Sequence, residues 1–357
     1  MDQKEKTLAI ELCRFKDPDK RKLERLIKGG NATSSVLGVI FANRIAGIAY
    51  RTLKDTGLLG QTDREFRTAL GSAAIMNSKR NEDFLGCLRF LSNELEACGV
   101  PYALLKGAYL CGWYPEGCRT SNDVDVLVSP KDVGKLCAGL RLAGFRQGYM
   151  RNGEFVSATR REIIGSKMMR GETVPFIMET KLTFMPYLEV DVNFSLDYRN
   201  SDDGALQMML ESGKTQTVGN TPVRTLNEED FFLHLCVHLY KEATTLPWIV
   251  MRRDMIFYKY VDIYAMLHDF SEEMLEKAIG RAEHFGMRRE FLYCLHSVEA
   301  FFGKSRYADV MRPTDEEISS ITEVVSPQEK KIYSYTEPDP VKRFFAKDRA
   351  AMLSEVR

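Results

Sequence analysis

Residues 122–128 read Asn-Asp-Val-Asp-Val-Leu-Val, and this is the most informative stretch of the chain. Side chains along a strand alternate between its two faces. Asp123 and Asp125 therefore share one face, while Val124, Val126 and Val128 point into the core. Two carboxylates at one strand edge offer hard oxygen ligands, which suit a divalent cation such as Mg²⁺ together with substrate phosphates. The stretch predicts a buried strand that carries part of a metal site.

A second stretch, residues 188–194, shows the same alternation of acidic or polar residues with apolar ones. It reads Leu-Glu-Val-Asp-Val-Asn-Phe, with its polar residues on one face and its apolar residues on the other. Three carboxylates on neighbouring strands can hold two metal ions around a phosphoryl centre, as polymerases and nucleases do. Asp191 is the predicted third ligand. Glu189 shares its face and is the rival for that position.

Upstream, residues 102–110 predict a short apolar strand that runs through a glycine into a helix. They read Tyr-Ala-Leu-Leu-Lys-Gly-Ala-Tyr-Leu. A glycine at such a junction lets the backbone approach a phosphate closely, and the N–H groups at a helix start attract anions. The order along the chain is strand, Lys106-Gly107, helix, Arg119, the Asp-x-Asp pair and then the distant Asp191.

In these motifs the chain resembles the nucleotidyltransferase superfamily with the DNA polymerase β-type fold. Within it, the chain is most similar to the group labelled uncharacterised nucleotidyltransferases, which has Leu-Lys-Gly and Arg-x-x-x-Asp-x-Asp signatures. Here these are residues 105–107 and 119–125. The resemblance is good over about 100–130, acceptable over 187–196 and loose over the helices from 228 to 270.

The chain departs from the superfamily pattern at one point. Relatives usually have Gly-Ser or Gly-Gly after the first strand, whereas this chain has Gly107-Ala108. The serine hydroxyl that would touch a terminal phosphate is absent. Lys106, Arg119 or Ser121 would take its place, and these residues with Gly107 form the predicted nucleotide-binding set.

The resemblance implies an α+β fold: a polymerase β-like core with a mixed sheet, flanked by N-terminal and C-terminal helical regions. It implies a nucleotidyltransferase (EC 2.7.7 type) in which an acceptor oxygen attacks the α-phosphorus of a nucleoside triphosphate such as ATP. Asp123, Asp125 and Asp191 would be both catalytic and metal-binding, and they would hold two Mg²⁺ ions, with Mn²⁺ as an alternative. Asp191 would also accept the proton of the acceptor hydroxyl.

Composition limits the partners and the compartment. The 357 residues include 50 basic and 50 acidic side chains, so the net charge gives no support to a dedicated nucleic-acid binder. The eight cysteines include no Cys-x-x-Cys pair, and no apolar run reaches the length of a membrane helix. The charged amino terminus lacks the apolar core of a signal peptide. We expect a cytoplasmic protein that does not bind a membrane.

The pattern predicts three segments: a helical region over 1–98, the catalytic core over 99–225 and a helical lobe over 226–357. In the first, an apolar stretch after Ser34-Ser35 predicts a helix that stops before Gly57, and Asp63 caps a long helix closed by Gly99. In the core, Ser129 is the expected cap of a helix that ends at Gly144. In the lobe, Asn227 and Ser271 precede helices, a further helix covers 258–267, and the remainder predicts short helices.

Two features of the sequence leave alternatives open. Residues 146–170 are rich in arginine and lysine, and they form either a solvated hairpin region or a mobile basic flap that meets the triphosphate or an anionic acceptor. His234 and His238 stand four residues apart, so they are zinc ligands, core or surface histidines, or, for His238 with Lys241, part of an acceptor pocket.

The acceptor is expected to be a small molecule or a peptide. A toxin-like nucleotidyltransferase that modifies protein or tRNA is the alternative among enzymes. A catalytically silent nucleotide-binding module is the alternative of another class, although such a module has no reason to retain three carboxylates.

Overall fold

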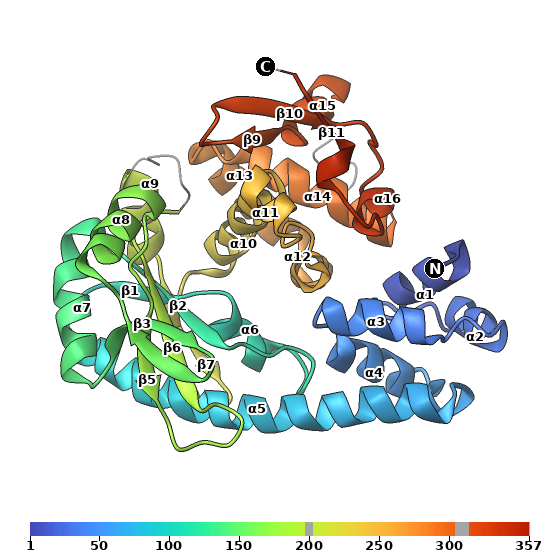
Figure 1. The fold of residues 1–357 in the computed structure, drawn as a ribbon, viewed down its shortest axis with the longest axis horizontal. Coiled ribbons are helices and arrows are strands. Elements are labelled where there is room, and N and C mark those ends of the chain that lie inside the picture. The colour runs from blue at the N-terminus through green and yellow to red at the C-terminus, as the bar shows by residue number, and fades with distance from the viewer. Residues whose placement is uncertain (197–202, 304–313, 357) are drawn as a thin grey trace. The chain divides into compact units, whose positions relative to one another are not determined.

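The computed structural model describes residues 1–196, 203–303 and 314–356 (Figure 1). The chain forms two compact units. The first comprises residues 1–72 and 232–357, and the second comprises 73–231. The predicted boundaries at 98 and 225 both fall inside the second unit, and the division into three segments stays a prediction.

The second unit is built on an eight-stranded mixed sheet with the order β4-β3-β5-β6-β2-β1-β8-β7. Its strands are β1 (Tyr102–Leu104), β2 (Asp123–Val128), β3 (Arg146–Arg151), β4 (Glu154–Ser157), β5 (Phe176–Glu179), β6 (Tyr187–Asn193), β7 (Lys214–Val218) and β8 (Thr221–Thr225). Most neighbours are antiparallel, but β2 pairs with β6 and β1 pairs with β8 in parallel. The mixed sheet and the helical flanks confirm the predicted fold class.

The helices of the second unit are α6 (Gly107–Trp113), α7 (Val133–Leu142), α8 (Arg160–Arg170) and α9 (Asp203–Glu211), and α5 (Arg64–Ala97) enters it from the first unit. Residues of α5, α6 and α7 pack on the apolar face of the sheet. Leu88 of α5 and Leu136 of α7 pack in one core with Val124, Val126 and Val190 of the central strands. Figure 1 shows α5 and α7 against the sheet. Because side chains alternate along β2 and β6, burial of their valines directs the acidic residues to the other face.

The first unit is mainly helical. Its N-terminal helices are α1 (Gln3–Glu11), α2 (Lys20–Lys28), α3 (Ser34–Ala42) and α4 (Ala46–Asp55), followed by the short η1 (Leu59–Gln61). Its later helices are α10 (Glu228–Ala243), which enters from the second unit, α11 (Leu246–Val250), α12 (Phe257–Asp269), α13 (Glu272–His284), α14 (Arg288–Phe302), α15 (Asp315–Ile321), α16 (Pro340–Phe344) and η3 (Ala350–Met352). Among the helices of the described residues, none has the length and apolarity needed to span a membrane.

Residues that favour the position before a helix predicted several helix starts correctly. The Asn227 side chain accepts a hydrogen bond from the Asp230 N–H at 2.8 Å, and the Ser271 hydroxyl accepts one from the Met274 N–H at 3.1 Å. The long helix α5 begins directly after Asp63. These ends follow from the preference of Asn, Ser and Asp for the position before a helix.

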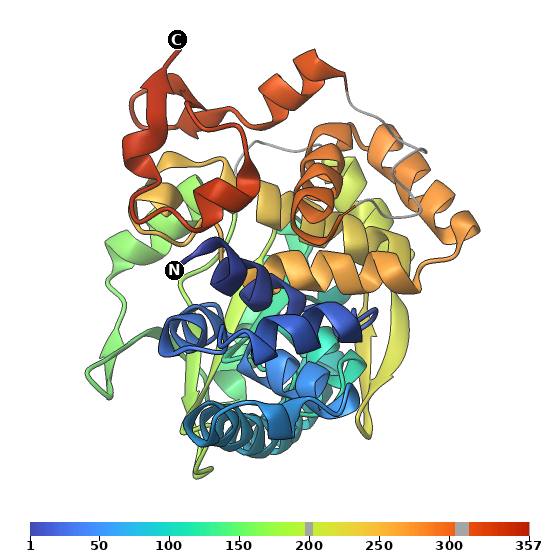
Figure 2. The same cartoon turned by 90° about the vertical axis from the view of Figure 1, so that its right-hand side faces the viewer.

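Three local predictions were wrong. The apolar stretch after residue 34 forms two helices, because Arg44 adopts φ 57° in the turn between them. Ser129 makes no side-chain cap, and Pro130 opens a 3₁₀ turn, η2 (Pro130–Asp132), before α7. The C-terminal residues form a three-stranded sheet as well as helices (red in Figures 1 and 2). Its strands are β9 (Val324–Ser326), β10 (Lys331–Tyr335) and β11 (Leu353–Glu355).

Candidate active site

Four carboxylates share one face of the central strands. In the parallel pair of β2 and β6, Asp123 is the register partner of Glu189, and Asp125 is the partner of Asp191. Residues two apart on a strand point the same way, so the two rungs stack along one face. Val124, Val126, Val190 and Val192 are fully buried on the other face. The structure therefore brings the predicted triad together and adds Glu189 to it.

Lys106 is the cation that pairs with this group in the described residues. Its Nζ lies 2.8 Å from Oδ1 of Asp125, and the two side chains are 21% and 10% exposed. Its backbone has φ 48° and ψ −119°, an uncommon conformation for a residue with a Cβ. The Leu105 N–H donates to the Asp125 carbonyl at 3.0 Å, and the Leu110 N–H donates to the Lys106 carbonyl at 2.9 Å. Lys106 is thus fixed on both sides with its ammonium among the carboxylates.

The charges of this site act on one another. Burial opposes the charge of Lys106, but the carboxylates, Asp125 foremost, outweigh burial and raise the pKa of the ammonium. Burial, and then the charges of Asp125 and its neighbours, raise the pKa of Asp191 well above its usual range. Burial also raises the pKa of Glu189, with further contributions from Asp123 and Asp125. One ammonium does not balance the carboxylates, so the face attracts further cations.

Gly107 and Ser121 are packed against each other. A Cβ at position 107 would lie 2.1 Å from Oγ of Ser121, so only glycine fits without displacing the serine. The Ser121 hydroxyl lies 3.0 Å from the Asp123 carbonyl oxygen and 3.1 Å from Oδ1 of Asp123. The contact observed at this glycine is therefore with Ser121, and Ser121 positions Asp123.

Arg119 is buried in the loop before β2. Its guanidinium donates to the Thr120 carbonyl at 2.5 Å, and its own carbonyl accepts a hydrogen bond from the Asn81 side chain of α5 at 2.9 Å. Burial raises the pKa of the Cys111 thiol to about 12, and the nearby Arg119 charge works in the other direction. The hydrogen bond from Asn81 ties the loop to α5. The predicted phosphate contact of Arg119 stays a prediction.

Sequence reasoning missed two contributors to the site. The Asn193 amide lies 3.4 Å from Oδ1 of Asp125 and donates to the Asp191 carbonyl at 3.2 Å. Its place two residues after Asp191 was a usable signal, because it shares the carboxylate face. Glu172, which forms an isolated bridge with Asn193, adds negative charge near Asp191. No local pattern indicated Glu172.

The donor chemistry fits Mg²⁺, although the side chains are not arranged around an ion. Within residues 1–196, 203–303 and 314–356, no group of three or more His, Cys, Asp or Glu side chains stands ready to hold a metal. At Asp125 the position beside the carboxylate is taken by the Lys106 ammonium. Carboxylate oxygens in excess of cations are nonetheless the ligands that Mg²⁺ uses.

The histidine pair belongs to the first unit and sits in a charge network on α10. His238 Nε2 lies 3.2 Å from Oε1 of Glu242, and Glu242 also pairs with Lys259 of α12. The rings of His234 and His238 stack with their centroids 6.4 Å apart. This arrangement supports the reading as core or surface histidines over a zinc site. The acceptor role of His238 and Lys241 stays a prediction.

The basic segment forms a hairpin at the sheet edge followed by α8. β3 and β4 pair antiparallel, Arg146 pairs with Glu179 at 2.6 Å, and its guanidinium lies 4.1 Å from the centre of the Phe155 ring. The side chains of Met169 and Arg170 lie outside the described part of the structure. The hairpin interpretation is confirmed for β3 and β4 but not for 160–170, which form α8, and a role of the segment at the triphosphate or an anionic acceptor stays a prediction.

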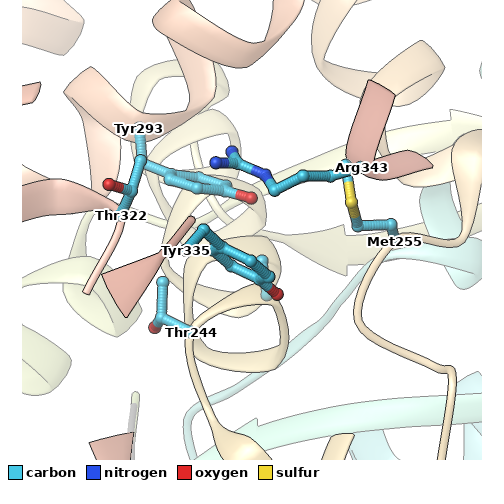
Figure 3. A pocket seen from close by; sticks show the side chains of 7 residues that line it. Thr244, Met255, Tyr293, Thr322, Tyr335 and Arg343 are labelled. Carbon is cyan, nitrogen blue, oxygen red and sulfur yellow. The ribbon is translucent and has the colours of Figure 1, made fainter. Parts of the chain in front are cut away.

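A narrow pocket in the first unit lies between aromatic rings (Figure 3). The Arg343 guanidinium lies 4.5 Å from the centre of the Tyr335 ring and donates to the carbonyls of Glu337 and Pro338. The pocket has no room for a water molecule, so it is a packing gap and not a ligand site. It is lined by Ala243, Thr244, Met255, Tyr293, Thr322, Tyr335 and Arg343.

Comparison with known proteins gives one match over most of the chain. The family model described as uncharacterised nucleotidyltransferase matches residues 31–303, a range that includes every residue of the carboxylate site. A comparison with curated proteins found no match.

Two solved structures are similar to part of the chain. One is the crystal structure of an antigenic nucleotidyltransferase-like protein from Paracoccidioides brasiliensis, with 14% identity over 61% of this chain and 96% of that protein, at a TM-score of 0.34. The other is the solution structure of the antibiotic-resistance factor ANT(2'')-Ia, with 12% identity over 59% of this chain and 98% of that protein, at a TM-score of 0.30.

Proposed function

Because the chain belongs to the uncharacterised nucleotidyltransferase family, we propose that it is a Mg²⁺-dependent enzyme that transfers a nucleoside monophosphate from a nucleoside triphosphate. The acceptor would be a hydroxyl or similar group of a small molecule or peptide. The observation that carries this proposal is the in-register pairing of Asp125 with Asp191, flanked by Asp123 and Glu189. Like charges repel when placed this close, so a site that retains them is built for a cation.

In the proposed reaction the acceptor oxygen would bond to the α-phosphorus and its proton would pass to Asp191. The bond from that phosphorus to the bridging oxygen would break, and pyrophosphate would leave. Asp123, Asp125 and Asp191 would hold Mg²⁺. Bound Mg²⁺ would lower the pKa of the acceptor hydroxyl and stabilise the negative charge on the leaving group. Ser121 keeps the Asp123 carboxylate in place, and Asn193 does the same for Asp125.

Lys106 would contact the triphosphate once that anion is bound. Its ammonium already lies at the carboxylate face, and a compact charge with three donors suits a phosphate oxygen. Lys106 would thereby replace the serine hydroxyl that relatives place after the first strand. Arg119 and Ser121 remain the other candidates for this contact.

Isothermal titration with each nucleoside triphosphate, in Mg²⁺ and in EDTA, tests the proposal. We expect binding in Mg²⁺ and strongly weakened binding in EDTA, because only a bridging cation makes a polyanion compatible with the carboxylate face. Equal affinity in both conditions would contradict a metal-dependent site. Transfer of an α-labelled nucleotide to components of a cell extract then separates an enzyme from a silent nucleotide-binding module, and the size class of the labelled product separates small-molecule, protein and tRNA acceptors.

A further inference from the structure

Lys106 occupies the place at Asp125 that a cation ligand would take. Its Nζ lies 2.8 Å from Oδ1 of Asp125, and the Asn193 amide approaches the same oxygen at 3.4 Å. Both partners of the ion pair are largely shielded from solvent, so the contact is screened less than a surface pair. The carboxylate of Asp125 therefore has a counter-ion supplied by the chain itself.

The backbone shows that this placement is built into the fold. Lys106 has a positive φ of 48°, and non-glycine residues hold such conformations only where their surroundings enforce them. Here the enforcement is visible, since β2 fixes Leu105 on one side through the Asp125 carbonyl and α6 begins on the other. The same residue, Asp125, thus anchors the backbone before the lysine and the ammonium at the end of its side chain.

Resting on the proposed function, we propose that Lys106 is an exchangeable internal cation that competes with the divalent ion for Asp125. A metal ion arriving alone must displace the ammonium from Asp125, its ion-pair partner in the described residues, and add a second cation beside it. A metal ion arriving with a triphosphate offers the ammonium a new anionic partner. Lys106 therefore couples metal binding to nucleotide binding, and the empty enzyme binds free divalent ions weakly.

Titration with Mn²⁺, followed by the electron paramagnetic resonance signal of the free ion, measures this competition directly. Lys106→Gln removes the charge and should tighten binding of Mn²⁺ alone by about 10-fold, within the usual range of coupling between two sites. Lys106→Arg keeps a cation and should bind Mn²⁺ as the natural protein does. Lys131→Gln removes an exposed lysine beyond the far end of β2 and serves as the matched control.

The same titration in the presence of an α,β-methylene triphosphate analogue should reverse the order. The natural protein should then bind Mn²⁺ more tightly than Lys106→Gln, because the variant has lost the contact to the phosphates. Circular dichroism establishes that each variant is folded, and Lys106→Met, which keeps the length of the side chain, replaces the glutamine variant if that one is not.

The outcomes separate this inference from the proposed function. If the natural protein binds Mn²⁺ with the analogue but Lys106→Gln binds Mn²⁺ alone no more tightly, the competition does not exist and the proposed function stands. If the natural protein binds Mn²⁺ neither alone nor with the analogue, both are overturned.

Discussion

Two regions of the molecule differ in how far their buried charge is neutralised. One is the ion pair of Asp254 with Arg349 in the first unit, and the other is the carboxylate site of the second unit. Arg349 meets Asp254 with two hydrogen bonds, at 2.7 and 2.6 Å, and Asp254 has no exposed surface. In the carboxylate site Asp123, Asp125, Glu189 and Asp191 share a face, and the cation paired with them in the described residues is one lysine.

The difference shows which charges serve the fold. A planar guanidinium that satisfies both oxygens of one carboxylate leaves no charge for a ligand to meet. Burial, and then the charges of the neighbouring carboxylates, raise the pKa values of Asp191 and Glu189, so ionising these two groups opposes folding. A protein retains an excess of carboxylates where a ligand removes it, so the imbalance marks the functional site and the balance marks the structural one.

The largest effect should come from removing a carboxylate of the site. Asp125→Asn is expected to lower nucleotidyl transfer by about 10²–10³-fold or more, because charge stabilisation through the metal is lost. The variant should stay folded. Label transfer from an α-labelled triphosphate measures the loss, and Glu154→Gln, at an exposed position on β4 of the same sheet, is the control. Full transfer by Asp125→Asn would show that the excess of carboxylates does not mark a functional site.

For the ion pair of Asp254 with Arg349, we expect mutation to change the stability of the fold. Arg349→Met leaves the Asp254 carboxylate buried without its partner, which should cost about 3–5 kcal/mol of unfolding free energy. Urea denaturation measures this cost. Adding Asp254→Asn to Arg349→Met should recover part of it, since the uncompensated charge is gone. Lys331→Ala, which breaks an exposed pair with Glu355, should change little. If Arg349→Met lost no more unfolding free energy than Lys331→Ala, the buried pair would not support the fold.

Gly107→Ala tests how tightly the carboxylates are held. The new Cβ would meet Ser121, which contacts Asp123, so both stability and metal affinity should fall, the former by about 1–3 kcal/mol. Ser121→Gly in the same chain should restore much of the stability. Gly134→Ala on α7 has open space around the new Cβ and is the control. If Gly107→Ala is as harmless as Gly134→Ala, the packing of residue 107 against Ser121 does not position the site.

The smallest effect is a gain in stability. Without metal, Asp191→Asn should raise the melting temperature, because the folded protein no longer has to ionise a carboxyl whose pKa is raised above 3.8 by burial and by its neighbours. A gain of 1 kcal/mol corresponds to about 2–4 °C in a domain of this size, which scanning fluorimetry resolves.

The gain has a defined pH dependence. A raised carboxyl pKa contributes stability that is present below the usual pKa and is lost as the pH rises through the folded-state value. The advantage of Asp191→Asn should therefore be absent in acid and grow as the pH rises through the pKa of Asp191. Mg²⁺ should reduce the advantage by stabilising the natural protein. A variant less stable than the natural protein at neutral pH would place Asp191 among the residues that serve the fold.

Local patterns were enough to predict β1, β2 and β6, and to assign the two faces of β2 and β6. The alternation of Asp and Val fixed the orientation of β2 and β6, and Asn227 and Ser271 marked helix starts through contacts three residues away. The strands β9, β10 and β11 were missed. β9 and β11 are only three residues long, too short to show a period, and no motif beside them marked a strand as Lys106-Gly107 did after β1.

Contacts between residues far apart in the chain could not be predicted from local patterns. The sequence indicated that Lys106 and Asp125 belong to one site but placed the lysine at a phosphate, whereas the structure pairs it with the carboxylate. The register that sets Asp125 beside Asp191 joins residues far apart in the chain. Such pairing depends on the packing of the whole sheet, which short patterns do not describe.

The direct register of β2 with β6 also limits how the family can evolve. Substitutions on β6 affect either its core side or its carboxylate side, because the two sets of residues alternate. A single-residue deletion within the strand would exchange them, turning Val190 and Val192 toward solvent and acidic residues toward the core. Relatives can therefore be expected to vary this strand by replacement, while changes in length accumulate in loops. An alignment gap inside 187–193 would indicate a misaligned sequence or a protein that has lost both the fold of this sheet and its activity.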